Sequence, residues 1–193
     1  MHAKLQVGAW AILGRVSHAL EYLVLFALVG GESAGLFVPG ETALIAAAAL
    51  AARGRLDLPV VIAVAAAGAI VGDNIGYVAG RRGVRRLLRR RQRLVEQAER
   101  FFERHGAPAV FLARWITGLR VVAAWVAGTS AMPWRRFVLW NALGGIAWAI
   151  SVGALGYVLG RAAARVLGAL GVGLAIAVVA AGLALLAWRR RAS

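Results

Sequence analysis

Four carboxylates of this chain lie in or beside apolar stretches, where a charge is costly. They make up half of its eight acidic residues and are Glu21, Glu32, Glu41 and Asp73. An ionised carboxylate at membrane depth costs about 2.5–3.5 kcal/mol on insertion scales. A basic partner, water or protonation has to offset that cost. These residue types therefore indicate ion pairing or proton exchange as their chemistry.

Arg114 and Arg120 are the matching cations, separated by six positions around the pair Thr117-Gly118. A guanidinium group binds phosphate through a planar and often bidentate fork. A helix that restarts after Gly118 would also direct free backbone N–H groups and a positive dipole end at the same place. We therefore expect Arg114, Arg120 and Gly118 to contribute to a site for an anionic headgroup.

The stretch GLFVPGETAL (residues 35–44) interrupts an apolar segment with Pro39, Gly40 and Glu41. Proline and glycine break the helix, and Glu41 then lies in the first turn of a returning helix, where the dipole favours a negative charge. We expect Pro39 to support the tip of a hairpin and Gly40 to line the headgroup site. Glu32 and Glu41 are expected to exchange protons. The alternative is that they form static ion pairs with the arginines, which only pin the segments together.

Asp73 lies one position away from a row of glycines at every fourth residue, 68, 72, 76 and 80. Such a row forms a flat face for close helix packing, and packing is the role we expect for the glycines. For Asp73 the sequence leaves two roles open, a cavity residue that exchanges protons and a hydrogen-bonded structural residue. Tyr77, Asn141 and Trp148 are expected to be structural residues near the site.

The composition is that of an integral membrane protein. The 193 residues are 61% hydrophobic, whereas a soluble domain is about half apolar. The runs 58–79 and 166–188 are each long enough to cross a hydrocarbon core of about 30 Å, which takes about 20 helical residues. The chain has no cysteine, which excludes disulfides, thiolate metal sites and cysteine nucleophiles. We expect no metal and no cofactor.

The net charge of +15 is concentrated beside the apolar runs. Ten arginines fall within residues 81–104, and three more lie at 189–191. Such clusters mark the cytoplasmic side of a membrane protein, and they attract anionic lipid headgroups at about 1 kcal/mol per basic residue. We therefore expect a multi-pass protein of the bacterial cytoplasmic membrane with both termini in the cytoplasm. Nucleic acid is not an expected partner.

The apolar segments and their breaks divide a single membrane domain, residues 1–193, into seven parts. In order these are a first helix (10–30), a first hairpin (31–56), a transmembrane helix (58–80), a cytoplasmic basic amphipathic helix (81–106), a second hairpin (107–132) and two further transmembrane helices (133–160 and 166–188). The arginine clusters share one side only if both hairpins enter the membrane and return. Backbone breaks at that depth require a surrounding protein or water-filled cavity, so two re-entrant hairpins imply an enclosed polar cavity.

A short internal repeat supports this organisation. GYVAGR (76–81) recurs as GYVLGR (156–161), on a span that we expect to run in the opposite direction. Inverted repeats with broken helices that meet near the membrane midplane are typical of secondary transporters. The predicted fold is therefore an all-α integral membrane fold, an inverted repeat with two opposed re-entrant helical hairpins plus transmembrane helices.

Several motifs in order resemble the DedA family of bacterial membrane proteins, which shares the VTT, or SNARE-associated, domain with eukaryotic lipid scramblases. They are GESAGLFVPGETAL (31–44), Gly72-Asp73-x3-Tyr77-x2-Gly80, Arg114-x5-Arg120 and Asn141-x2-Gly144-x3-Trp148. The resemblance implies two opposed re-entrant hairpins and movement of a phospholipid or of undecaprenyl phosphate across the cytoplasmic membrane. It also implies that an acidic pair, Glu32 and Glu41, and an arginine pair, Arg114 and Arg120, are needed for that activity.

The chain departs from the family pattern after Arg114, which is followed by Trp115-Ile116-Thr117 instead of an aromatic residue, a small apolar residue and proline. Gly118 is then expected to supply the turn.

The expected function is that of a lipid transporter or flippase for a phosphate-bearing lipid, coupled to protons. The alternative is a proton-coupled transporter of ions or small solutes that uses the same carboxylates. An enzyme is not expected, because a lipid phosphatase needs a nucleophile or an acid–base pair at the phosphate. The three histidines, His2, His18 and His105, lie outside the proposed cavity. The expected partners are the lipid substrate, protons, and anionic headgroups at the basic helix; self-association and the identity of the lipid are left open.

Overall fold

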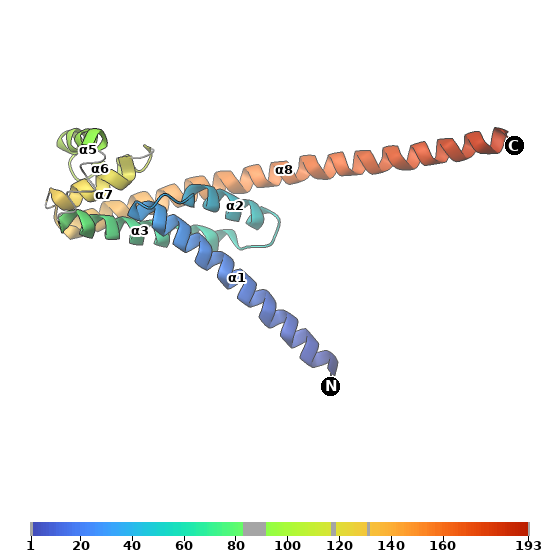
Figure 1. The fold of residues 1–193 in the computed structure, drawn as a ribbon, viewed down its shortest axis with the longest axis horizontal. Helices are drawn as coiled ribbons and strands as arrows, with labels where there is room; N and C mark the ends of the chain where they lie inside the picture. Colours follow the sequence, from blue (N-terminus) through green and yellow to red (C-terminus); the bar gives the residue numbers. More distant parts are fainter. Residues whose placement is uncertain (1, 83–91, 117–118, 131, 193) are drawn as a thin grey trace.

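The computed structural model describes residues 2–82, 92–116, 119–130 and 132–192, and their side chains except those of 2–17, 92, 94 and 166–192. The regular secondary structure of the described residues is helical, which confirms the all-α class. The helices are α1 (His2–Ala34), α2 (Gly40–Ala52), α3 (Leu58–Arg81), α5 (Gln92–His105), α6 (Ala109–Ala113), α7 (Leu119–Thr129) and α8 (Trp134–Ala192) (Figure 1).

Two stretches of helix are long and apolar enough to cross a membrane, α3 and residues Trp134–Arg165 of α8. They coincide with the expected spans 58–80 and 133–160. The third expected span, 166–188, falls within α8 but outside the side chains that the structure describes.

The helices α3 and α8 run antiparallel at the centre, with Gly145 of α8 beside Ile70 and Gly153 beside Ile62. The glycines of α3 are its packing face, as expected. Gly68 and Gly72 meet the backbone of α1, while Gly76 and Gly80 meet Trp125 of α7. A row of small residues thus lets α1 approach one half of α3 and α7 the other.

The first hairpin consists of the end of α1, the turn 35–39 and α2. Gly35 has a φ of 105°, and it ends α1 in a Schellman motif, in which Leu36 N–H donates to Gly31 O at 2.9 Å and Gly35 N–H to Glu32 O at 3.0 Å. Such a φ favours glycine. The first helix therefore ends at Ala34, beyond the expected end at residue 30, and Glu32 lies in its last turn. The entering limb of this hairpin is the end of α1 itself.

The second hairpin is described as α6, the turn residues 114–116 and α7. After Ala113 the backbone bonds shorten to the three-residue spacing, with Trp115 N–H donating to Leu112 O at 3.2 Å and Ile116 N–H to Ala113 O at 3.1 Å. The helix is thus interrupted although this sequence has no proline there. Thr117 and Gly118 lie outside the described residues, so the role expected for Gly118 is not described.

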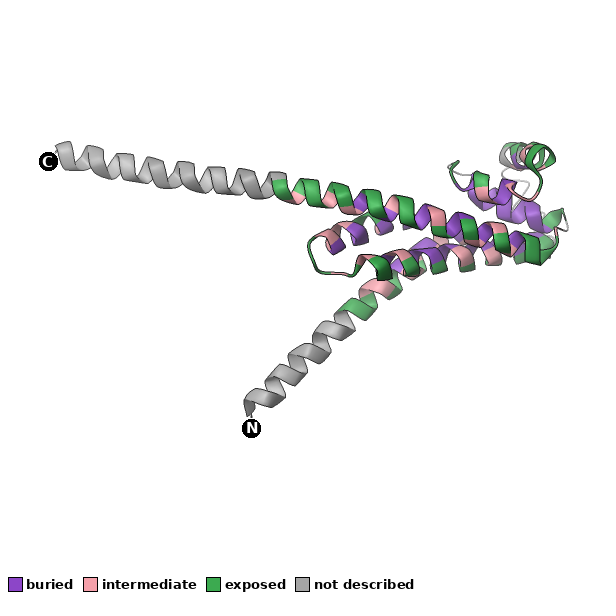
Figure 2. Cartoon of the chain, turned by 180° about the vertical axis from the view of Figure 1, so that it is seen from behind, coloured by how far each residue is buried: buried purple, intermediate pink, exposed green. Residues whose placement is uncertain are grey.

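The helix α7 is buried from Leu119 to Gly128, as Figure 2 shows. It is covered on one side by α5, whose Ala98 is fully buried against it and whose Val95, Phe101 and Phe102 are partly buried. The apolar side of this amphipathic helix therefore packs in part on the protein itself. Its arginines, Arg93, Arg100 and Arg104, are exposed.

Candidate functional site

A cavity of about 630 Å³ lies where the two hairpins meet. One wall is the turn 35–39 with Glu32 before it and Glu41 after it; the other walls carry Arg114, Trp115, Arg120 and Val121 of the second hairpin and Trp148 and Val152 of α8. The first turns of both α2 and α7 therefore contribute side chains to the same space. The acidic and the basic segments lie opposite one another.

Glu32 is the cavity carboxylate that contacts an arginine. Its Oε1 forms an ion pair with Arg120 Nη2, and its Oε2 accepts the backbone N–H of Glu41 at 2.7 Å, in the first turn of α2. The Arg120 side chain is only 8% exposed, and its guanidinium carbon lies 5.3 Å from the centre of the Trp148 ring. A cation at that distance is attracted to the ring face, so Trp148 of α8 also supports Arg120.

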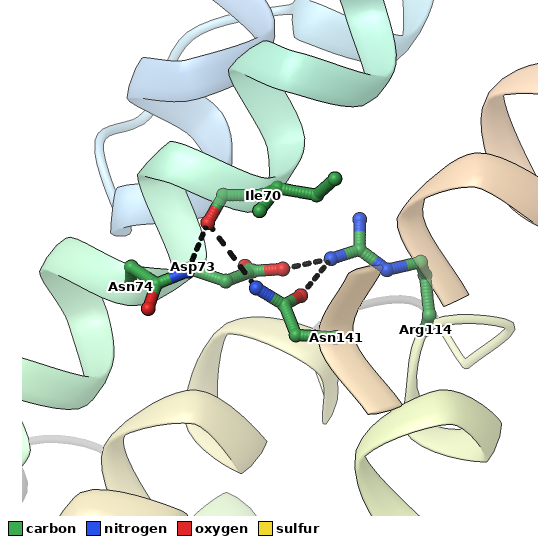
Figure 3. Close-up of polar contacts among 5 residues, drawn as sticks. All are labelled: Ile70, Asp73, Asn74, Arg114 and Asn141. Carbon is green, nitrogen blue, oxygen red and sulfur yellow. Dashed lines mark hydrogen bonds and ion pairs between the residues drawn. The ribbon is translucent and has the colours of Figure 1, made fainter. Parts of the chain in front are cut away.

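Arg114 belongs to a second and separate ion pair, shown in Figure 3. Its Nη2 binds Asp73 Oδ2 and also donates to Asn141 Oδ1 at 2.7 Å. Asn141 Nδ2 donates in turn to the backbone oxygen of Ile70 at 3.2 Å. The Arg114 and Asp73 side chains are 2% and 5% exposed. This buried set joins the tip of the second hairpin to both α3 and α8.

The pair between Arg114 and Asp73 leaves two buried atoms, Arg114 Nη1 and Asp73 Oδ1, without a hydrogen-bond partner in the part of the chain that the structure describes. Room for the guanidinium comes from two glycines of α8. A Cβ atom at Gly144 would lie 3.5 Å from Arg114 Nε, and one at Gly145 would lie 3.8 Å from Arg114 Cζ. Arg114 also lines the cavity, so it belongs both to the buried pair and to the wall of the site.

Glu41 lines the cavity together with both arginines and is exposed. Among the described residues no ion pair joins it to either arginine, and the carboxylate that accepts the Glu41 backbone N–H in the first turn of α2 is that of Glu32. Gly40 explains this approach, because a Cβ atom there would lie 2.5 Å from Glu32 Oε2 and 2.7 Å from Val29 Cα. Pro39 precedes the first turn of α2 and lines the cavity.

Tyr77 is buried outside the cavity. Its hydroxyl donates to the backbone oxygen of Met132 at 2.5 Å and accepts from Arg81 Nη1 at 3.3 Å. Its ring stacks on Phe137 at 4.6 Å. These contacts hold the connection between α7 and α8 against the end of α3.

The contact of Arg114 with Asp73 and Asn141 is the part of the site that the sequence did not predict, because both arginines were expected to face Glu32 and Glu41. The three residues come from three different parts of the chain. In the sequence, Arg114 is 41 positions from Asp73 and 27 positions from Asn141. The available signal was Asp73 itself, a carboxylate in an apolar span that required a cation. The register of α3 against α8 decides which arginine supplies it.

Comparison with known proteins places this geometry in a wider context. The VTT domain profile matches residues 38–158. An uncharacterized membrane protein of Mycobacterium tuberculosis is 41% identical over 195 residues, covering 95% of this chain and 89% of the relative. An uncharacterized membrane protein of Synechocystis is 39% identical over 147 residues, 72% of this chain and 67% of the relative. The protein named DedA of Escherichia coli is 30% identical over 163 residues, 80% of this chain and 71% of the relative. No solved structure matches.

Proposed function

We propose that this chain, which belongs to the DedA family of VTT-domain membrane proteins, moves a phosphate-bearing lipid across the membrane. The substrate would be undecaprenyl phosphate or a phospholipid, and its movement would be coupled to protons. The observation that carries the proposal is the cavity, whose lining combines a buried cation with exposed apolar side chains. The cation is Arg120, and Leu36, Phe37 and Trp115 form what we call the apolar edge.

The apolar edge favours a lipid over a small solute. Phe37 is fully exposed and Leu36 is 64% exposed, and both line the cavity. Exposed large apolar side chains around a pocket are typical of a site for an apolar ligand. A carrier of ions or small osmolytes, the alternative that the carboxylates also allow, needs no such apolar edge at its binding site.

We further propose that both hairpins are re-entrant, one from each side of the membrane. Support comes from the middle of α3, where the ends of the two hairpins meet neighbouring residues: Ser33 lies against Gly72, and Arg114 binds Asp73. The first hairpin approaches along the Leu58 end of α3, where Asp57 N–H donates to Tyr22 at 3.0 Å. The second leaves along the other end, where Gly128 of α7 packs on Tyr77.

The packing of the two copies of the GYxxGR motif supports an inverted repeat. In the first copy, Gly76 and Gly80 pack against Trp125 in α7. In the second copy, a Cβ atom at Gly156 would lie 3.2 Å from Ile45 Cα, and one at Gly160 would lie 2.8 Å from Ala49 Cα, both in α2. Each copy thus receives the returning helix of the hairpin from the other half of the chain.

The proposed location is the bacterial cytoplasmic membrane, which the chain would cross several times, with α5 and its arginines in the cytoplasm and in contact with anionic headgroups. The charge distribution supports this, by the positive-inside rule. It also supports cytoplasmic termini, although the side chains at both ends lie outside the description. We propose no enzymatic step and no cofactor, because the cavity's arginines and carboxylates suffice to bind and release an anion.

Transport in liposomes tests the proposal. Purified protein is reconstituted with labelled undecaprenyl phosphate or labelled phosphatidylethanolamine, and flipping is followed with and without a pH gradient. For whichever lipid the wild-type protein moves, we expect Arg120→Gln to lower the flipping rate at least about tenfold. The reason is that a hydrogen bond to a charged group contributes about 1.5–3 kcal/mol.

The matched control is Arg161→Gln, which removes an exposed arginine that contacts Tyr157 outside the cavity. It should retain the wild-type rate. Equal flipping by wild-type protein and Arg120→Gln, or flipping no faster than in empty liposomes, would contradict the proposal. Acidification of the liposomes by a small ion without lipid movement would favour the solute carrier.

A further inference from the structure

The carboxylate of Glu32 occupies the position of a bound anion. It contacts a guanidinium, that of Arg120, and a backbone N–H in the first turn of a helix, that of Glu41. These are the two kinds of donor that bind phosphate oxygens in proteins. The Trp148 ring lies against the same guanidinium. The groups that suit a phosphate are therefore already occupied by the chain's own carboxylate.

We propose that Glu32 is an internal competitor for the anion site, and that a phosphate group enters by displacing its carboxylate from Arg120 and from the Glu41 N–H. The inference rests on the proposed function, since it specifies how that site is held when no lipid is bound. Displacement would substitute one anion for another, so the Arg120 guanidinium would never be left buried without a negative partner.

A second observation points to an external ligand at the same place. Arg114 Nη1 is buried without a hydrogen-bond partner in the described structure, and Arg114 lines this cavity. Glu32 does not satisfy it, because Glu32 contacts Arg120 and the α2 backbone. A phosphate has more acceptor oxygens than a carboxylate. It could therefore contact Arg120 and the Glu41 N–H and still offer an oxygen to Arg114.

The other two carboxylates near the site are not built for this role. Asp73 is enclosed by Arg114 and does not line the cavity. Glu41 lines the cavity but makes no ion pair within the described residues. Glu32 is 24% exposed at its side chain, and Gly40 leaves room for it, since a Cβ atom there would lie 2.5 Å from Oε2. Among the three, Glu32 alone both bridges the two donors and can leave them.

The experiment separates the effect of the bridge from the effect of charge. The probe is dihexanoyl phosphatidic acid, a short-chain lipid with a phosphate monoester, and dihexanoylglycerol is the control without an anion. Binding to the purified full-length protein is measured by calorimetry. Glu32→Asp keeps the charge but is one methylene shorter, so it cannot span both donors. Glu41→Gln removes a charge from the same cavity and leaves the bridge intact.

We expect Glu32→Asp and Glu32→Gln each to bind phosphatidic acid at least about tenfold more tightly than wild-type protein does, and Glu41→Gln to gain clearly less. Arg120→Gln should bind phosphatidic acid weakly, both alone and combined with a Glu32 variant. Circular dichroism and gel filtration check folding, and either Glu32 variant alone suffices for the comparison with Glu41→Gln.

Two results would overturn the inference. If wild-type protein binds the probe and the Glu32 variants bind no more tightly, or gain only as much as Glu41→Gln, then Glu32 does not compete and the anion site itself stands. If neither wild-type protein nor any Glu32 variant binds phosphatidic acid more tightly than dihexanoylglycerol, then the proposed function fails and the inference fails with it.

Discussion

The two arginines of the site have different surroundings, and the difference determines what each can do. Arg114 is held by Asp73 and by Asn141, all three buried. Arg120 is held by Glu32, which is partly exposed to the cavity. Removing one partner of a buried ion pair costs more folding free energy than the intact pair contributes, because the remaining charge stays desolvated. Arg114 is therefore mainly a structural link, and Arg120 is the arginine free to exchange partners.

A double-mutant cycle tests this difference. Arg114→Gln leaves the Asp73 carboxylate buried without its cation and should destabilise the protein by about 3–5 kcal/mol. Adding Asp73→Asn should recover a large part of that loss, because the uncompensated charge is then removed. The measurement is thermal unfolding in detergent, followed by intrinsic tryptophan fluorescence.

Arg120→Gln is the comparison for this cycle, and it should cost less because Glu32 has access to the cavity. Strictly additive effects of Arg114→Gln and Asp73→Asn would show that the two side chains are not coupled, against the contact in Figure 3.

At this scale the sequence predicts part of the site. The breaks at Pro39-Gly40 and near Gly118 indicate that an acidic and a basic segment lie together, and Glu32 does pair with Arg120. The sequence does not predict which acid binds which arginine, because that depends on how α3 and α8 are aligned. Nor does it predict that the carboxylate of Glu32, rather than that of Glu41, binds Arg120 and accepts a backbone N–H in the first turn of α2. That placement follows from where α1 ends.

The helices are assembled crosswise, with α2 along α8 and α7 along α3. Each contact depends on glycines that admit the backbone of the partner helix. A Cβ atom at Gly80 would overlap the backbone oxygen of Trp125, and one at Gly160 would lie 2.8 Å from Ala49 Cα. Neither obstacle is the flexible end of a side chain. The positions of both hairpins are therefore fixed by backbone contacts to the GYxxGR glycines.

Gly80→Ala and Gly160→Ala test this crosswise packing. Each should destabilise the protein by about 1–3 kcal/mol, the usual range for overpacking, with Gly80→Ala the larger because its obstacle is a backbone oxygen. Thermal unfolding in detergent measures the effect. Ala67→Leu adds more atoms at an exposed position of α3, so it should leave the midpoint unchanged. Unaltered midpoints for both glycine variants would mean that the hairpins do not pack as described.

The elements could be predicted with unequal success, for physical reasons. Spans 58–80 and 133–160 match helices because long apolar runs have few alternatives to a membrane-spanning helix. The first helix is expected to end at residue 30, but it continues to Ala34. Gly30 lies inside the helix and faces α3, where Gly68 lies against it, whereas Gly31 lies beside Leu36 and Val38 of the turn. Small residues that serve packing and small residues that end a helix look alike in a sequence.

In the whole molecule, both hairpins contact α3 at the same place, the middle of the helix. Ser33 and Arg114, one from each hairpin, reach Gly72 and Asp73 there. The turn 53–57 lies at one end of α3 and α5 follows the other. If α3 spans the bilayer, the two hairpin tips lie near its midplane, and the turn 53–57 and α5 lie on opposite sides of it.

Single-cysteine labelling tests this arrangement directly, because the chain has no cysteine of its own. Arg53→Cys in the turn and Glu103→Cys in α5 replace exposed residues. A membrane-impermeant maleimide should label the first in intact cells and the second only in inverted vesicles. Phe37→Cys and Trp115→Cys lie at the two tips. In both preparations they should react with the maleimide much more slowly than the two surface cysteines, because the reaction needs a solvated thiolate.

Protein unfolded in a denaturing detergent provides the control for these four variants. All four cysteines should then react, because unfolding exposes each thiol to water. Labelling of Arg53→Cys and Glu103→Cys from the same side would contradict a spanning α3. Rapid labelling of Phe37→Cys in intact cells would place the first hairpin at the membrane surface. The cavity between the hairpins would then have no access to the bilayer interior, and a lipid could not cross through it.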